Sequence, residues 1–391
     1  MTHPHQTTRS LSERIVALAS AFGPSGLENE VSAQLVQEAR DAQNNIIMQD
    51  TLQSVYLREK GSHPSILLDA HIDEVGFMVH AIHDNGTFSM LPLGGWTAQY
   101  LPGTVLKVKT TDGTFVPAII ASRPPHYTRD LPSVPAADFF TLAADCGTSS
   151  RAETEALGIV PGCFIVPDTP ARLDEERNLV LGKAFDDRLG AAVCLETFLQ
   201  AEKEGLGEDI MALFSAQEEV GERGAAAAAA HLNNIRLCIA FEGCPADDTF
   251  SSPDEIQSAL NKGPMIRAFD KSMITHPAFL ELARNVAREN GLPLQIAVRK
   301  GGGTNGGIYH QHNIPTIVIG IPVRYALSPA GWCSLQDARN GVKLTLAILR
   351  KLSSLRKQRE ENGKETLNPA EREVLDILEG MHSLESFFEE Q

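Results

Sequence analysis

Side chains that can bind a metal ion recur at the ends of short apolar runs in this chain. They form four clusters, three after apolar runs and one where such a run meets a helical pattern: His71 and Asp73, Asp186 and Asp187, Glu218 and Glu219, and Glu242. Sites in open α/β sheets assemble at the carboxyl ends of strands, so these clusters are expected to converge. Imidazole and carboxylate groups are common ligands of divalent cations. The pattern therefore predicts a metal centre.

The spacing within two of these clusters fits such a centre. His71 and Asp73 are two residues apart in an extended segment and share a face. Asp73 can then accept the second ring N–H of a metal-bound His71 and fix its tautomer. In the pair Glu218–Glu219, one carboxylate can bind metal while the other acts as a general base for a metal-activated water. Taken singly, His71 could be a satisfied core histidine, and the glutamate pair an exposed acidic turn.

Asp186 and Asp187 stand between the apolar run 179–181 and a helical pattern. One aspartate at such a junction can give an oxygen to each of two metal ions and fix their separation. The alternative is a helix N-cap, because aspartate often accepts backbone N–H bonds at helix starts. For these two residues alone, the cap is the more frequent outcome.

The elements that must position these side chains predict an α/β protein with an insertion. Helical and apolar patterns alternate before residue 74 and after residue 179. Between them, hairpin signals at Asp84-Asn-Gly and Thr111-Asp-Gly separate alternating runs, which indicates a β-rich region. The predicted divisions are residues 1–74 and 179–356 for the catalytic domain, 75–178 for the insert, and 357–391 for a charged tail. Within the tail, Asn368-Pro369 begins a candidate amphipathic helix.

Composition limits the classes of function. The chain has 391 residues and a formal net charge of −16, which argues against a general nucleic-acid or anionic-membrane binder. No apolar run is long enough to span a bilayer, and the amino terminus lacks the apolar core of a signal peptide. The six cysteines form no CxxC pair, as in reduced proteins of the cytoplasm. We therefore expect a cytoplasmic protein that binds neither nucleic acid nor membrane.

The candidate ligands lie within longer motifs, which occur in this order: His71-Ile-Asp-Glu-Val-Gly-Phe, Lys183-Ala-Phe-Asp-Asp-Arg-Leu-Gly, Gln217-Glu-Glu-Val-Gly-Glu-Arg-Gly-Ala, Gly301-Gly-Gly-Thr and Ile319-Gly-Ile-Pro-Val-Arg-Tyr. With Gly94-Gly-Trp and Leu101-Pro-Gly in the insert, they resemble the tetrahedral, glutamyl and deblocking aminopeptidases of metallopeptidase family 42. The resemblance runs from about residue 12 to residue 355 and leaves out the tail.

This resemblance implies a phosphopeptidase-like three-layer α/β/α catalytic domain with an inserted β-barrel-like lid domain. It also implies two zinc or cobalt ions, a peptide substrate and self-association into dodecamers or dimers. The metal ligands it implies are His71 and Glu242 for the first ion, Glu219 for the second, and Asp186 for both. Asp73 would support His71, Glu218 would be the general base, and the peptide bond between Asp186 and Asp187 would be cis.

Two positions depart from the family pattern. The family's final ligand is a histidine in Arg-Tyr-x-His-Ser, and this chain has Leu327 at that position. The family's Gly-Thr-Asp-Ala is Gly303-Thr-Asn-Gly here, within the glycine-rich residues 300–307, which we expect to form a flexible loop. Leucine cannot bind a metal, so the second ion would keep Asp186, Glu219 and solvent. His310 or His312 is a possible substitute, and both are equally well explained as structural residues.

The resulting prediction is a metal-dependent aminopeptidase-like hydrolase that cleaves residues from the amino end of short peptides. Its metal-activated water would be assisted by Glu218. One alternative is a catalytically impaired or inactive relative that acts as an assembly or binding protein, because Leu327 removes a ligand. Another is a hydrolase of acylated small molecules, which would use the same residues.

Overall fold

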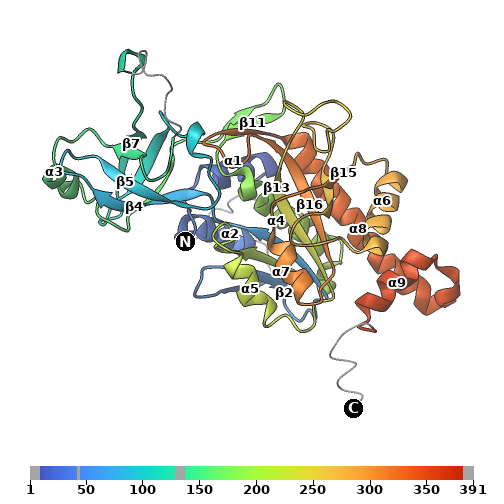
Figure 1. Ribbon diagram of the computed structural model, residues 1–391. Helices are drawn as coiled ribbons and strands as arrows, with labels where there is room; N and C mark the ends of the chain where they lie inside the picture. Colours follow the sequence, from blue (N-terminus) through green and yellow to red (C-terminus); the bar gives the residue numbers. More distant parts are fainter. Residues whose placement is uncertain (1–8, 42–44, 128–136, 382–391) are drawn as a thin grey trace.

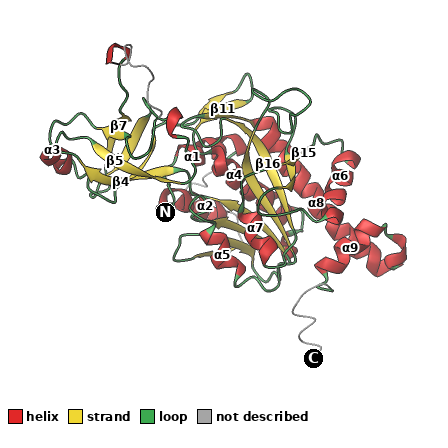
Figure 2. Ribbon diagram, in the orientation of Figure 1, coloured by secondary structure: helices red, strands yellow, loops and turns green. Residues whose placement is uncertain are grey.

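A single large sheet forms the centre of the molecule (Figures 1 and 2). The computed structural model describes residues 9–41, 45–127 and 137–381. In these residues an 11-stranded sheet has the order β1-β2-β12-β3-β13-β16-β17-β11-β10, with β14 and β15 alongside β16. The adjacent strands β12, β3, β13 and β16 run parallel. The strands are β1 (Asn45–Gln49), β2 (Val55–Glu59), β3 (Ile66–His71), β10 (Arg172–Asp174), β11 (Leu179–Gly182), β12 (Ile210–Ser215), β13 (Leu237–Pro245), β14 (Met265–Phe269), β15 (Gln295–Val298), β16 (Thr316–Arg324) and β17 (Gly331–Ser334).

Helices cover both faces of this sheet. One face is covered by α1 (Leu11–Ser20), α2 (Asn29–Asp41), α4 (Phe185–Lys203), α6 (Pro277–Glu289) and α8 (Leu335–Asn362). Helix α9 (Pro369–Leu378) packs against α6 and α8. The other face packs against α5 (Arg223–Ala229) and α7 (Asn305–Gln311). Strand β3 contributes to the apolar cores on both faces, because side chains alternate along a strand. Leu68 lies in the core with α4 and α8, and its neighbour Leu67 lies in the core with α5. Burial on both faces explains the continuous apolar runs.

A closed β-barrel is inserted between β3 and β10. Its strands follow the order β4-β5-β8-β7-β6-β9. They are β4 (Gly76–Ile82), β5 (Phe88–Leu93), β6 (Val105–Lys109), β7 (Phe115–Ile120), β8 (Ala143–Asp145) and β9 (Phe164–Pro167), accompanied by the helix α3 (Arg151–Ala156). The barrel has its own core, which includes Phe77, Phe88 and Ile165. Figure 1 shows it projecting to one side of the sheet.

This architecture confirms the predicted three-layer fold with an inserted barrel. The hairpins predicted at Asp84-Asn-Gly and Thr111-Asp-Gly are the β4–β5 and β6–β7 connections. The tail helix is α9, where Asn368 forms the expected N-cap with a capping box. In the part of the chain that the structure describes, no helix is long and apolar enough to cross a membrane.

Two local expectations were wrong. Glu242 was expected just after a strand, but β13 continues to Pro245 and places Glu242 within the strand. The loop expected over residues 300–307 ends early, because Thr304 caps α7 by accepting the N–H of Gly306. A threonine oxygen at the cap outweighs the low helix propensity of the two glycines that follow.

Candidate metal centre

The four clusters predicted from sequence meet at the carboxyl end of the parallel strands. They form two overlapping groups whose possible ligand atoms lie within 4.8 Å of one another: His71, Asp186 and Glu219, and His71, Asp187 and Glu242. In the second group all the side chains are buried. His71 ends β3, and Asp186 and Asp187 begin α4. Segments more than 100 residues apart in the sequence therefore supply one site.

Asp73 holds the imidazole of His71 in place. The Nδ1 atom of His71 lies 3.2 Å from Asp73 Oδ1, and its Nε2 atom lies 3.1 Å from Asp186 Oδ1. Asp73 also accepts the backbone N–H groups of Glu218 and Glu219 at 2.9 and 3.1 Å. Burial disfavours the charged form of Asp73, but these hydrogen bonds outweigh burial and lower its pKa. One carboxylate therefore orients both the imidazole and the glutamate turn.

Each residue of the aspartate pair has a different partner. Asp187 accepts the backbone N–H of Gly190 at 2.8 Å, as an N-cap does, whereas Asp186 points to His71. The peptide bond between them is cis. Strand β13 passes so close that a Cβ on Gly243 would lie 2.2 Å from the carbonyl oxygen of Phe185. Asp187 therefore makes a cap-like hydrogen bond, and Asp186 lies beside His71, where the metal-ligand prediction places it.

The acids of the centre are crowded and poorly compensated. Burial raises the pKa of Glu218 to about 8, and the negative charges of Asp73 and Asp186 add to this effect. Burial, followed by the charge of Asp186, also raises the pKa of Glu219 and of Glu242 well above the ordinary range. Glu219 Oε1 and Asp187 Oδ2 are buried without a hydrogen-bond partner. Buried charges of this kind are otherwise paired or coordinate metals, so the residues fit a divalent cation.

A buried ion cluster fixes the junction that carries Asp186. Lys183 Nζ lies 2.6 Å from Glu74 Oε2, and Arg188 Nη2 lies 3.3 Å from Glu74 Oε1. Arg188 also donates to the carbonyl oxygens of Leu18 and Gly23, both at 2.8 Å. The cluster ties the start of α4 to the end of β3 and to the loop after α1.

Leu327 lies beside the centre. With Val75 and Asp186 it lines a small cavity of about 20 Å³. Neither His310 nor His312 belongs to a candidate metal group among the described residues. His310 is exposed, and Nδ1 of His312 donates to the backbone carbonyl oxygen of Ile308 at 2.9 Å. Neither histidine therefore takes the ligand role of the histidine that Leu327 replaces.

Sequence reasoning missed some acids of this region. Asp187 was placed at the junction but was not connected with Glu242. Glu28 was not selected, although it is fully buried and accepts the N–H groups of Gly26 and Gln217 at 2.8 and 3.2 Å. Its position at the start of a helical pattern resembles an ordinary first-turn glutamate. Only burial, which the sequence does not state, distinguishes it.

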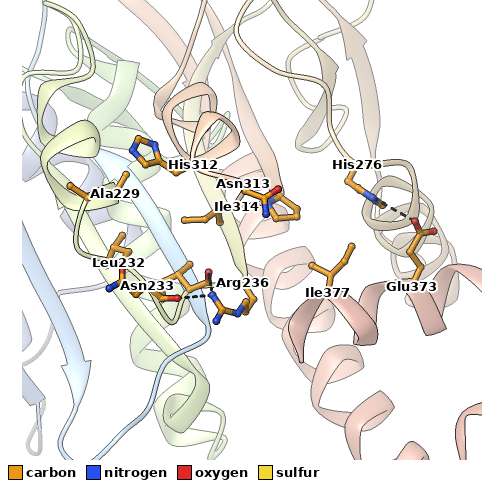
Figure 3. A pocket seen from close by; sticks show the side chains of 13 residues that line it. Ala229, Leu232, Asn233, Arg236, His276, His312, Asn313, Ile314, Glu373 and Ile377 are labelled. Carbon is orange, nitrogen blue, oxygen red and sulfur yellow. Dashed lines mark hydrogen bonds and ion pairs between the residues drawn. The ribbon is translucent and has the colours of Figure 1, made fainter. Parts of the chain in front are cut away.

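A larger cavity lies elsewhere. It measures about 520 Å³ and lies at the amino ends of β13 and β16, lined among others by Arg236, His276, His312 and Glu373 (Figure 3). None of the residues in the two candidate metal groups lines it.

Known proteins are similar to this chain in sequence. The family model described as M42 glutamyl aminopeptidase matches residues 53–344. A putative aminopeptidase FrvX of Escherichia coli is 30% identical over 331 residues, covering 83% of this chain and 91% of that protein. A glutamyl aminopeptidase of Lactococcus lactis is 32% identical over 297 residues, covering 74% and 81%.

Solved structures of aminopeptidases have a similar fold. The TET aminopeptidase from a marine sediment archaeon of the Thaumarchaeota matches with a TM-score of 0.81 and 34% identity, covering 88% of this chain and 97% of that one. An aminopeptidase of Desulfurococcus kamchatkensis matches with a TM-score of 0.79 and 29% identity, covering 87% and 94%. Motifs, fold and the converging acids lead to the same assignment: this chain belongs to the M42 glutamyl aminopeptidase family.

Proposed function

We propose that this protein is a metal-dependent aminopeptidase that removes residues from the amino end of short peptides. The observation that carries the proposal is the convergence of one imidazole and several buried acids at the carboxyl end of the sheet. Family membership supports the same reaction. The inactive alternative is not favoured, because every acid predicted for catalysis or metal binding is retained and reaches the centre.

His71, Asp186 and Glu242 are proposed to hold one cation, with Asp186 and Glu219 available to a second. Zinc or cobalt is proposed for the position that contains imidazole, because these borderline metals favour nitrogen ligands. A bound divalent cation supplies Lewis acidity, which polarises a carbonyl group and makes water a stronger nucleophile. Asp187 can complete the buried side, since its Oδ2 atom has no other partner.

Glu218 is proposed as the general base. Its Oε2 atom lies 3.8 Å from His71 Nε2, and its backbone N–H is fixed by Asp73. A carboxyl whose pKa is raised to about 8 can take up and release a proton near neutral pH. Asp73 is proposed to act through His71, by holding its tautomer and ring orientation.

Assembly and location are proposals of the same kind. Pyrococcus horikoshii TET1 peptidase can assemble into a tetrahedron or a large octahedral shell. It matches this chain with a TM-score of 0.76 and 27% identity, covering 87% of this chain and 99% of that one. We propose that this chain also self-associates, as a dodecamer or dimer, in the cytoplasm. Size-exclusion chromatography with light scattering measures the assembly directly.

The function is tested with the purified full-length protein and a panel of aminoacyl-arylamides. The protein is stripped with a chelator and then assayed with zinc, cobalt or manganese. Turnover that appears only with added metal supports the proposal. Turnover that does not depend on metal, or no turnover on any aminoacyl-arylamide, contradicts it. A parallel panel of N-acylated small molecules separates an aminopeptidase from a hydrolase of such compounds.

A further inference from the structure

The centre has only one imidazole nitrogen to offer. Among the described residues, His71 is the one histidine in either candidate group. Its Nδ1 atom is engaged by Asp73 at 3.2 Å, which leaves Nε2 for a cation. One nitrogen serves one ion. A second ion in the same cluster must therefore bind through oxygen ligands.

The side of the centre near Glu219 is bounded by apolar groups. A Cβ built on Gly94 would lie 3.0 Å from Glu219 Oε2 and 2.6 Å from the side chain of Val75. A Cβ on the next residue, Gly95, would lie 3.7 Å from the side chain of Leu327. Val75, Leu327 and Asp186 also line one cavity. Leu327 therefore lies on the same side as Glu219, where it contributes no ligand.

The space at that side suits solvent. The cavity beside Asp186 and Leu327 measures about 20 Å³, which is room for about one water molecule. Carboxylate and water oxygens are the ligands that hard cations such as Mg²⁺ and Mn²⁺ accept. The other candidate group consists of His71, Asp187 and Glu242, all of which are buried. The two positions therefore differ in ligand chemistry and in exposure.

We propose that this centre binds two unlike cations. A zinc-type ion is retained at His71 and Glu242, and a harder ion such as Mn²⁺ binds weakly at Asp186 and Glu219. The inference rests on the proposed metal-dependent function and adds the selectivity of each position. With zinc alone, the protein is expected to retain about one ion per chain.

The test counts metal ions in chelator-stripped, full-length protein after dialysis against zinc, manganese or both. Elemental analysis gives the number of ions per chain, and electron paramagnetic resonance detects bound Mn²⁺. The Leu327→His variant adds an imidazole and is expected to raise retained zinc from about one to about two ions per chain. Leu327→Phe, which adds a ring without a ligand nitrogen, is the matched control and is expected to stay at about one.

Glu219→Gln is a second, independent variant. It is expected to abolish the Mn²⁺ signal and to leave retained zinc unchanged, so the inference can be tested even if Leu327→His fails to fold. Two equally retained zinc ions in the unaltered protein overturn this inference and leave the proposed function standing. Mn²⁺ binding that survives Glu219→Gln also overturns it. Failure to bind any cation overturns the inference and the proposed function together.

Discussion

The two ends of the parallel strands differ in how they use charge. At the carboxyl end, His71, Asp187 and Glu242 are buried together beside a cavity of only about 20 Å³. At the amino end, a cavity of about 520 Å³ is lined by Glu373 and other polar side chains that are exposed or half-buried (Figure 3). Burying uncompensated carboxylates is costly, so it persists where a ligand offsets it. In this molecule, buried charge marks the candidate centre better than open space does.

The largest effect is expected from Glu218→Gln at the carboxyl end. Removing a general base lowers turnover by about 10²- to 10⁴-fold, and the bound metal should stay unchanged. Steady-state kinetics with parallel metal analysis checks both points. Glu222→Gln, in the same turn, is the matched control and should retain much more activity. A Glu218→Gln enzyme with near-normal turnover would exclude this residue as the base.

Asp73→Asn should weaken metal binding. Loss of the charged partner of His71 Nδ1 is expected to reduce metal affinity about 10- to 100-fold. Competition with a chromogenic chelator measures the affinity. Asp168→Asn, which removes a half-buried ion pair with Lys107 of the barrel, serves as the control and should leave the affinity unchanged. Equal affinities for Asp73→Asn and the unaltered protein would contradict the positioning role.

Glu28→Gln should stabilise the fold in a pH-dependent way. Burial raises the pKa of Glu28 from 4.5 to about 7, so the folded state favours the protonated form. That contribution to stability is fully present below about pH 4.5 and is lost as the pH rises through about 7. Glutamine imitates the protonated form, so the gain in melting temperature over the unaltered protein should grow across this range.

Thermal melts from pH 4.5 to pH 8 test this expectation for Glu28→Gln, and Glu289→Gln, at an exposed position of α6, is the control. A gain that is constant with pH, or that falls as the pH rises, would show that ionised Glu28 is not unfavourable in the fold.

The smallest effect is expected at the amino end. Glu373 lies 3.6 Å from His276 Nε2, with more than half of the Glu373 side chain exposed. Glu373→Gln should change the free energy of unfolding by less than about 1 kcal/mol, because solvent screens such pairs. Turnover should be unchanged. A tenfold loss of turnover would break the comparison, since it would connect the large cavity to the reaction.

The sequence predicts the parallel strands, the hairpins and the candidate ligands near strand ends, such as His71 and Glu219, because each has a local signal. Strands buried on both faces read as continuous apolar runs, as at β3 and β12. Aspartate-glycine and asparagine-glycine pairs mark the barrel hairpins. The short strands β10, β14 and β17 lack such a signal, since tertiary pairing determines them.

Tertiary packing also explains which part of the site the sequence does not predict. Asp187 meets Glu242 only because β13 passes beside the start of α4, and no local pattern encodes that approach. Glu28 likewise joins the region through tertiary burial. The roles of the predicted ligands and the divisions at residues 75 and 178 stay predictions, whereas the fold class is confirmed by the barrel and the layered sheet.

The ion pair between Glu74 and Lys183 has a consequence for how the molecule can vary. The chain leaves the sheet for the barrel shortly after Glu74, and on its return it forms the sheet strands β10 and β11, the second of which ends directly before Lys183. The ion pair thus joins the two connections to the barrel where they meet the large sheet. Exchanging the outer strands of the barrel for those of another family member should therefore leave the spacing between His71 and Asp186 intact. The barrel can thus vary in sequence without disturbing the candidate metal centre.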